Sequence, residues 1–179
     1  MQNLKEKDLW EIIEKQKIKP LFQPIVSLQN GKIIAYEALS RVTGEYKDVS
    51  ISEMFDMATR LGSLWNLEKV CRSLAMKKAS EKPKNAKLFL NVDGHIILDA
   101  DFVKGFTKEN LERNGLKTND IVFEITERSD VENKDLLLKL IKHYESQGFA
   151  IAIDDIGSGY SGLNRLNYLN TLFLLGIRI

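Results

Sequence analysis

Five side chains that carry oxygen interrupt or end the apolar, strand-like runs of this sequence. They are Glu37, Asn91, Glu124, Asp154 and Asp155. An ionised carboxylate in such a setting costs folding free energy unless it is paired or bound to a cation. Binding sites in parallel α/β folds are built at the carboxyl ends of the strands. Because four strands each place an oxygen ligand near that end, the pattern predicts a shared site.

This set of ligands favours a hard divalent cation. Carboxylate and amide oxygens without His or Cys suit Mg²⁺ or Mn²⁺ rather than zinc. The two histidines, His95 and His143, stand in polar contexts and are expected at the surface. The adjacent Asp154 and Asp155 could bridge two cations, as in two-metal phosphoryl chemistry. The alternative interpretation is that the carboxylates form ion pairs in the core.

A polar loop rich in glycine, Asp154–Ser161 (DDIGSGYS), follows the last clear strand of the sequence. Its composition alone is compatible with an ordinary turn from a strand into a helix. It is also compatible with a mobile loop that controls a metal pair. The position of the loop, which begins with the two aspartates, favours the second interpretation.

The elements that must position these residues follow from hydrophobic periodicity. Residues 4–17 are expected to form an amphipathic helix, which Pro20 would end. The strand-like runs 22–28 and 32–39 flank the pair Asn30-Gly31, and Asn-Gly is the strongest short signal for a hairpin. The chain is therefore predicted to open with an antiparallel pair of strands.

Helices and strands alternate over the rest of the chain. The predicted helices cover 50–61, 64–79, part of 102–114 and 133–147, and the predicted strands cover 87–92, 121–126 and 149–154. Short apolar strands joined by connections of helix length indicate βαβ units and a parallel sheet that is buried on both faces. Cys71 follows the apolar spacing of its helix, so we expect a small core residue there and not a nucleophile.

Composition narrows the classes of function. The 179 residues suit one domain, and 26 Lys and Arg against 25 Asp and Glu leave a net charge of +1. This balance argues against binding of duplex nucleic acid, which usually needs a basic excess. Short apolar runs and a single cysteine predict no membrane span and a cytoplasmic location. The lysine-rich stretch 77–87 is interpreted as a helix end and a solvated connection, with a phosphate-binding patch as the alternative.

Five motifs, in the same order, resemble those of the EAL-domain family, the cyclic di-GMP phosphodiesterases. Residues 37–41 (EALSR) carry the motif that names the family, and residues 22–26 (FQPIV) resemble its opening strand. Residues 89–93 (FLNVD) resemble its N-x-S segment, with Asp where Ser is usual. Residues 123–127 (FEITE) resemble its E-L/I-T-E strand, and residues 154–161 resemble D-D-F-G-T-G-Y-S.

The resemblance implies an α/β fold, namely a TIM-like (β/α) barrel whose first strand runs antiparallel to the others. This agrees with the predicted hairpin. The resemblance also implies hydrolysis of cyclic di-GMP to the linear dinucleotide with two Mg²⁺ or Mn²⁺ ions. By the same resemblance, the catalytic residues are Glu37, Glu124 and Asp154, and the metal ligands are Glu37, Asn91, Glu124, Asp154 and Asp155.

Four further residues take their roles from the resemblance. Gln23, Leu39 and Arg41 match positions that line the substrate. The guanidinium of Arg41 suits a phosphate because it donates in a fork. Glu127 matches the residue that anchors the loop 155–160, which is tied to dimerisation in the family. The implied ligand is therefore cyclic di-GMP, and we expect a homodimer or another form of self-association.

The resemblance ends near residue 170. The family continues with a strand that carries Lys in an L-K-x-D context, and later strands supply a Glu and a Gln, whereas residues 170–179 contain neither Lys nor Asp. We therefore expect an N-terminal helix over 1–19 and an EAL-like domain over 20–179. Its barrel would be incomplete at the C-terminus, with a tail that is divergent from about residue 170 through a premature end or a frameshift.

Because residues 170–179 depart from the family pattern, functions other than hydrolysis of cyclic di-GMP have to be considered. Without the Lys, Glu and Gln of the family, the chain is expected to have little or no turnover. The first alternative is a non-catalytic module that binds cyclic di-GMP or another protein. A second alternative is a different Mg²⁺-dependent α/β phosphohydrolase. A partial barrel would also expose strand edges, so the apolar tail 172–177 is expected to cover one edge or to pair with another chain.

Overall fold

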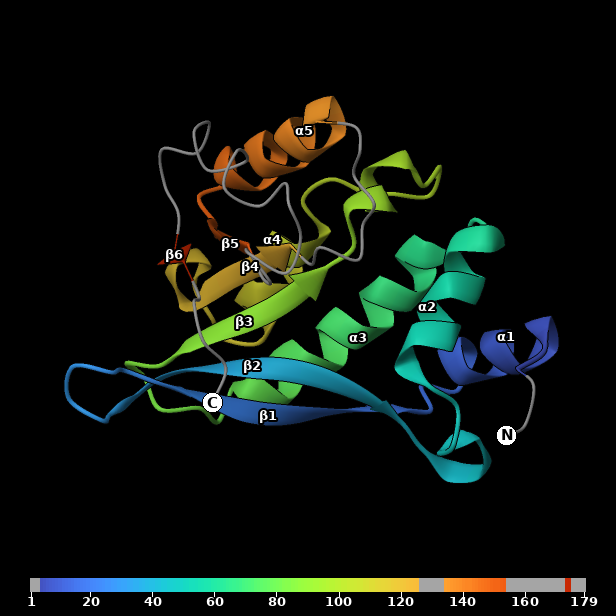
Figure 1. The fold of residues 1–179 in the computed structure, drawn as a ribbon, viewed down its shortest axis with the longest axis horizontal. Helices are drawn as coiled ribbons and strands as arrows, with labels where there is room; N and C mark the ends of the chain where they lie inside the picture. The colour runs from blue at the N-terminus through green and yellow to red at the C-terminus, as the bar shows by residue number, and fades with distance from the viewer. Residues whose placement is uncertain (1–3, 126–133, 154–172, 175–179) are drawn as a thin grey trace.

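The computed structural model describes residues 4–125, 134–153 and 173–174, which form a single mixed sheet with helices packed on it (Figure 1). Among these residues, six strands follow one another across the sheet in chain order: β1 (Ile18–Val26), β2 (Ile33–Val42), β3 (Lys87–Val92), β4 (Ile121–Ile125), β5 (Ala150–Ile153) and β6 (Phe173–Leu174). The described α-helices are α1 (Glu6–Glu14), α2 (Ile51–Arg60), α3 (Leu64–Ala79), α4 (Phe106–Arg113) and α5 (Lys134–Glu145). Short 3₁₀ helices are η1 (Gly44–Tyr46), η2 (Gly94–Leu98) and η3 (Thr118–Asp120).

The first two strands form the predicted antiparallel hairpin, in which Ile18 pairs with Val42. Gly31 in its turn has a φ of 68°, a left-handed conformation that glycine adopts without steric cost. Strand β1 begins four residues earlier than predicted and contains Pro20, which was expected to end the first helix. That helix already ends at Glu14. A proline is tolerated here because β1 is an edge strand of the described sheet and needs fewer amide donors.

All later strand pairs are parallel, as the alternating pattern predicts. Helices α2 and α3 lie between β2 and β3 in the chain, α4 lies between β3 and β4, and α5 lies between β4 and β5. Helix α3 and strand β3 have the predicted bounds. The short strand β6 pairs with β5, so this part of the apolar tail does cover an edge of the sheet.

The sheet has two distinct faces because successive side chains of a strand point to opposite sides. One face packs against α3, α4 and α5. The apolar strand residues in this cluster are Leu88, Leu90, Ile121, Phe123 and Ile151, and the large helix residues are Trp65, Met76, Leu140 and Tyr144. The other face carries a smaller cluster, made of Ala35, Phe89, Val122 and Ala152. The alternation therefore places Glu37, Asn91 and Glu124 on this second face.

A separate apolar cluster joins the first helix to the sheet. Leu9 and Ile12 of α1 are fully buried against Met54 of α2, Leu67 of α3 and Val42 at the end of β2. Helices α1 and α2 lie together at the end of the sheet opposite the β1–β2 turn (Figure 1). In the described part of the chain, no helix has both the length and the apolar character needed to cross a lipid bilayer.

Candidate functional site

Three of the predicted oxygen ligands lie side by side on neighbouring strands. Asn91 of β3 is the register partner of Glu124 of β4. The Asn91 side-chain amide Nδ2 donates a hydrogen bond of 2.9 Å to Oε1 of Glu37 on β2. The exposed fractions of Glu37 and Glu124 are only 5% and 1%, so both carboxylates are withdrawn from water. The fold therefore does bring Glu37, Asn91 and Glu124 together.

The donor set of these three residues fits a hard divalent cation. Two buried carboxylates and an amide are oxygen ligands of the kind that Mg²⁺ and Mn²⁺ prefer. Within the described ranges, no three His, Cys, Asp or Glu side chains come together as a metal-binding group. The other predicted ligands, Asp154 and Asp155, and the predicted loop anchor Glu127 lie outside the described residues. The two-metal site therefore stays a prediction.

The predicted substrate positions lie on the hairpin beside these ligands. Gln23 of β1 is the register partner of Glu37 and is exposed to solvent. Leu39 and Arg41 follow Glu37 on the same face of β2, and Arg41 Nη1 donates to the carbonyl oxygen of Ser40 at 2.7 Å. Leu39 and Arg41 line a cavity of about 310 Å³ together with Glu37 and Asn91, whereas Gln23 does not line it.

Other elements close this cavity from the helix side. Ile51, Phe55 and Asp56 of α2 contribute one wall. The start of α2 is held by Ser50, whose Oγ accepts a hydrogen bond of 3.0 Å from the Glu53 amide, as its sequence suggests. The cavity wall next to the EAL residues is therefore a capped helix with a defined starting point.

Cys71 of α3 also lines the cavity. Burial raises the pKa of its thiol to about 12, and the hydroxyl of Ser40 only partly opposes this effect. A thiol of this kind stays protonated at neutral pH and is a poor nucleophile. Cys71 is half-buried and packs against the apolar cluster of α1 and α2, in agreement with the expected small core residue.

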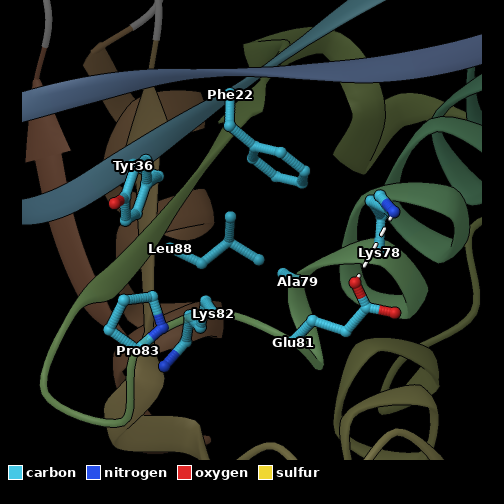
Figure 2. Close-up of a pocket in the computed structure, with 8 residues that line it drawn as sticks. All are labelled: Phe22, Tyr36, Lys78, Ala79, Glu81, Lys82, Pro83 and Leu88. Carbon is cyan, nitrogen blue, oxygen red and sulfur yellow. Dashed lines mark ion pairs between the residues drawn. The ribbon is translucent and has the colours of Figure 1, made fainter.

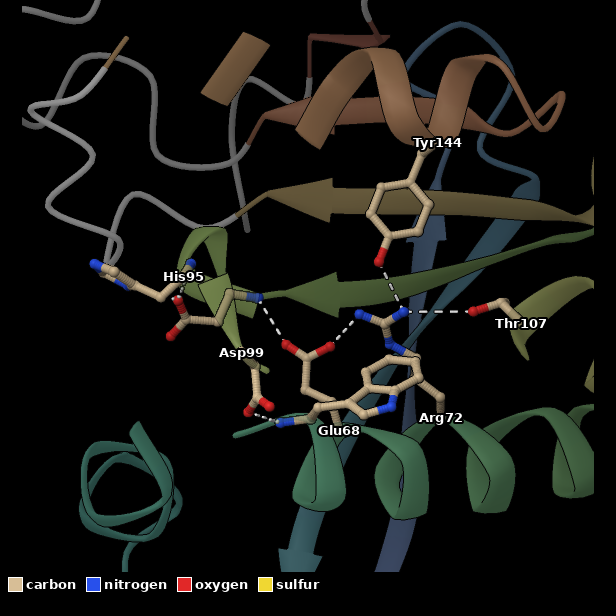
Figure 3. Close-up of polar contacts among 8 residues, drawn as sticks. Glu68, Arg72, His95, Asp99, Thr107 and Tyr144 are labelled. Carbon is tan, nitrogen blue, oxygen red and sulfur yellow. Dashed lines mark hydrogen bonds and ion pairs between the residues drawn. The ribbon is translucent and has the colours of Figure 1, made fainter. Parts of the chain in front are cut away.

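A buried polar network lies behind the site (Figure 3). The network is not among the sequence-based predictions. Glu68 and Arg72 of α3 form an ion pair whose side chains are each only 2% exposed. Oε1 of Glu68 accepts the Asp93 amide at 2.9 Å. Nη1 of Arg72 donates to Oη of Tyr144 at 2.8 Å and to Oγ1 of Thr107 at 3.4 Å. The network thus ties α3 to α4, to α5 and to the turn that follows β3.

Burial and the neighbouring charges both shift the pKa values of the groups in this network. Burial raises the pKa of the Glu68 carboxyl, and Arg72 opposes that shift. Burial alone would lower the pKa of Arg72, but Glu68 and Tyr144 raise it on balance. The Arg72 guanidinium also lies 5.5 Å from the ring centroid of Trp65 and 5.1 Å from that of Phe123, distances typical of cation–π contacts. The guanidinium is therefore held as a buried cation.

Asp93 and the two histidines complete the description of this region. Asp93, which stands where the family's N-x-S segment usually has Ser, lines the cavity. Its Oδ1 accepts a hydrogen bond of 2.9 Å from the His95 amide. Its Oδ1 also lies 2.9 Å from His95 Nδ1. Both histidines, expected at the surface, are only partly exposed: the His95 side chain is 36% exposed, and the His143 ring is half-buried against Phe102 and Tyr144. Polar neighbours in the sequence do not reveal this aromatic packing.

A second cavity of about 170 Å³ lies where β3 begins (Figure 2). Apolar side chains such as Phe22 point into it, and charged side chains stand at its rim. Lys78 pairs with Glu81 at 3.6 Å, and Lys82 pairs with Asp120 at 3.3 Å. Because these lysines already have carboxylate partners, stretch 77–87 agrees better with a helix end and connection than with a phosphate-binding patch.

Two proteins with similar sequences are PdeG and YkuI. The chain is 27% identical over 179 residues to PdeG of Escherichia coli, a probable cyclic di-GMP phosphodiesterase, and the match covers 92% of this chain and 33% of PdeG. It is 26% identical over 157 residues to YkuI of Bacillus subtilis, an uncharacterized EAL-domain protein, with 86% and 38% covered. The chain therefore spans between 33% and 38% of the length of these relatives.

Solved structures share its fold. The EAL enzyme Bd1971 with bound cAMP and cyclic di-GMP superposes with a TM-score of 0.76 at 25% identity, over 94% of this chain and 48% of that one. The family model for the EAL domain matches residues 6–174. Because that match covers nearly the whole sequence, and the antiparallel first strand and parallel successors agree with it, the chain belongs to the EAL domain family and has its TIM-like barrel fold.

Proposed function

We propose that this chain is a cyclic di-GMP phosphodiesterase domain, which binds the cyclic dinucleotide and hydrolyses it to the linear form. The observation that carries the proposal is the cluster of Glu37, Asn91 and Glu124 on one face of three adjacent strands, in which Asn91 pairs in register with Glu124 and donates a hydrogen bond to Glu37. The name of PdeG and the cyclic di-GMP in the Bd1971 structure support the same substrate.

The cluster suits the metal ions of that reaction. Glu37, Asn91, Glu124 and Asp154 would hold one Mg²⁺ or Mn²⁺, and Asp154 and Asp155 would hold a second. Such ions, when bound, lower the pKa of a bridging water and neutralise charge on the phosphate. The structure of BlrP1 from Klebsiella pneumoniae, 26% identical with a TM-score of 0.72, is a complex with manganese and cyclic di-GMP, which supports this assignment. That match covers 87% of this chain and 39% of BlrP1.

The protein's own side chains would orient the substrate. The Asn91 amide fixes the Glu37 carboxylate through its 2.9 Å hydrogen bond, which leaves the amide oxygen of Asn91 for a cation. Arg41 at the mouth of the cavity would donate to a phosphate oxygen, and Leu39 and Gln23 would contact the rest of the dinucleotide. The proposal also includes dimerisation through the loop that Glu127 anchors and a cytoplasmic location, the latter supported by the single cysteine.

A second candidate function is a cyclic di-GMP receptor with little or no turnover. The observation that favours it is the departure of residues 170–179 from the family pattern, since this stretch has neither the Lys nor the Asp of that motif. Binding without hydrolysis would then be the activity of this chain. Both functions use the same substrate positions, so they differ only in turnover.

The test measures binding and hydrolysis separately. Calorimetry with cyclic di-GMP in Ca²⁺ reports binding, and chromatography of the nucleotide after incubation with Mg²⁺ or Mn²⁺ reports turnover. Arg41→Ala should weaken binding by roughly ten- to a hundredfold, the value of a charge-assisted hydrogen bond, whereas Arg60→Ala at the exposed end of α2 should not.

Glu124→Gln should abolish turnover and metal-dependent binding, and the exposed Glu109→Gln serves as its control. Binding without hydrolysis would select the receptor function over the phosphodiesterase. If the chain with divalent cations shows no binding of cyclic di-GMP, both candidate functions are wrong.

A further inference from the structure

A second polar surface gathers positive charge on helices α4 and α5. Lys104 and Lys108 at the start of α4, together with Lys139, Lys142 and His143 of α5, line a hollow of about 700 Å³. We call this surface the basic hollow. It shares no lining residue with the cavity at the candidate site, so it is a separate feature of the molecule.

The described lining residues of the basic hollow carry an excess of positive charge. Among the described residues, no aspartate or glutamate lines the hollow. All four lysines are exposed, and none belongs to the ion pairs within the described ranges. By contrast, the lysines at the rim of the smaller cavity each have a carboxylate partner. Four cations around one concavity repel each other, and an anion in the hollow would relieve that repulsion.

The start of helix α4 adds to the attraction for an anion. Helix α4 begins after Gly105, which lines the hollow and has a left-handed φ of 86°, and no side chain caps the helix. The amide groups of an uncapped first turn carry partial positive charge. The charge of Lys104 also acts on the His143 ring, whose pKa is lowered mainly by burial and then by Lys104 and Arg72.

We propose that the basic hollow binds a short chain of phosphate groups, either free or carried by a nucleoside. Its volume lies within the roughly 300–1,000 Å³ of small-molecule sites. Lysine ammonium groups bind phosphate as point charges, and four of them line the hollow. The ligand class is therefore a compact polyanion.

Two larger partners fit the basic hollow less well. A protein segment would need apolar anchors, but Ile97 is the only aliphatic side chain among the described lining residues, and the exposed Leu98 and Val103 nearby do not line the hollow. Single-stranded nucleic acid stacks on exposed aromatic rings, and among the described lining residues His143 is the only ring, itself half-buried.

The test titrates the full chain with tripolyphosphate and with a nucleoside triphosphate in separate calorimetry experiments. EDTA is present so that neither probe binds through a metal. Lys104→Ser/Lys142→Ser should weaken binding of tripolyphosphate at least about tenfold, since each lysine contributes a charge-assisted contact. Lys77→Ser/Lys84→Ser removes the same charge from exposed positions elsewhere and should leave the affinity unchanged.

Two readouts separate the hollow from other sites. Arg41→Ala alters the candidate site and should not change the affinity for tripolyphosphate. The His143 ring, one of only two imidazoles in the chain, should show a higher pKa by NMR when the polyanion is bound, because the anion offsets the charge of Lys104. A nucleoside triphosphate that binds much more tightly than tripolyphosphate would identify the carried form as the ligand.

The proposal fails if tripolyphosphate and the nucleoside triphosphate do not bind. It also fails if the two double variants lose affinity equally, because that result would mean attraction to net charge alone. Binding of a poly-glutamate peptide in the absence of phosphate binding would replace it with a protein partner. All four substituted lysines are exposed, so the variants should retain the thermal stability of the parent chain.

Discussion

The buried ion pair of α3 makes a sharp prediction about stability. Both carboxylate oxygens of Glu68 accept hydrogen bonds, one from the Asp93 amide and one from Arg72. In Glu68→Gln, the new NH₂ group must face one of these donors, and the Arg72 cation loses its counter-charge at 2% exposure. Breaking a buried pair in this way costs about 3–5 kcal/mol. For a chain of this length, that corresponds to a drop in Tm of roughly 6–20 °C.

Helix α4 supplies the matched control, because Glu109 and Arg113 have the same i,i+4 spacing at the surface. Their side chains are 71% and 76% exposed and lie 3.9 Å apart, so Glu109→Gln should change the free energy of unfolding by at most about 0.5 kcal/mol. Urea unfolding followed by circular dichroism measures both variants. The double variant Glu68→Leu/Arg72→Met should lose less stability than Glu68→Gln, since no charge is left stranded. Equal losses for Glu68→Gln and Glu109→Gln would refute the reasoning.

Three further predictions concern single residues. Burial, with Lys104 and Arg72, lowers the pKa of His143 below its ordinary 6.5, so the unfolded chain binds a proton at this ring more readily than the folded chain does. The free energy of unfolding should therefore fall as the pH drops from about 7 to about 5. Urea unfolding of His143→Gln should show a smaller fall. Gly31→Ala should lower the free energy of unfolding by about 1 kcal/mol, measured by thermal unfolding, because alanine is strained at the left-handed φ of 68°. No clash adds to this cost, since an added Cβ meets no atom within 4 Å. Cys71 is half-buried and has a pKa of about 12, so it should react with iodoacetamide much more slowly in the native chain than after unfolding, and equal labelling rates would contradict this expectation.

The parts of the fold that sequence predicts best are those where local pattern and tertiary packing agree. The hairpin follows from Asn30-Gly31, and α3 and β3 have their predicted bounds because periodic apolar residues define them. The start of β1 is harder to predict, because Pro20 and Pro24 are unfavourable in the interior of a strand. Only the position of β1 at the edge of the described sheet makes the prolines acceptable, and sequence does not reveal which strand is at the edge.

The same contrast applies to the site. Glu37, Asn91 and Glu124 are predictable because each interrupts an apolar strand, and the parallel strands β2, β3 and β4 place these interruptions on one face of the sheet, within two residues of each other in register. The buried positions of Glu68 and Arg72 are not predictable in this way, since a Glu–Arg pair at i,i+4 is typical of a solvent-exposed helix face. Helix α3 is instead covered on several sides, by the sheet and by α2 and α4. Burial of this pair is therefore a tertiary property that no local spacing reports.

The position of the Glu68–Arg72 pair suggests why a buried charge pair stands at this point of the fold. Taking both groups out of water costs several kcal/mol, which contacts with each other only partly offset, so the pair is a poor source of stability. What it does supply is a fixed acceptor for the Asp93 amide, 2.9 Å from Glu68 and directly after the strand that carries Asn91. Strand register sets the level of Asn91 beside Glu124, but register ends where β3 ends. Holding the next turn requires a group that reaches it from α3, and an acceptor tied to Tyr144 and Thr107 through Arg72 meets that requirement.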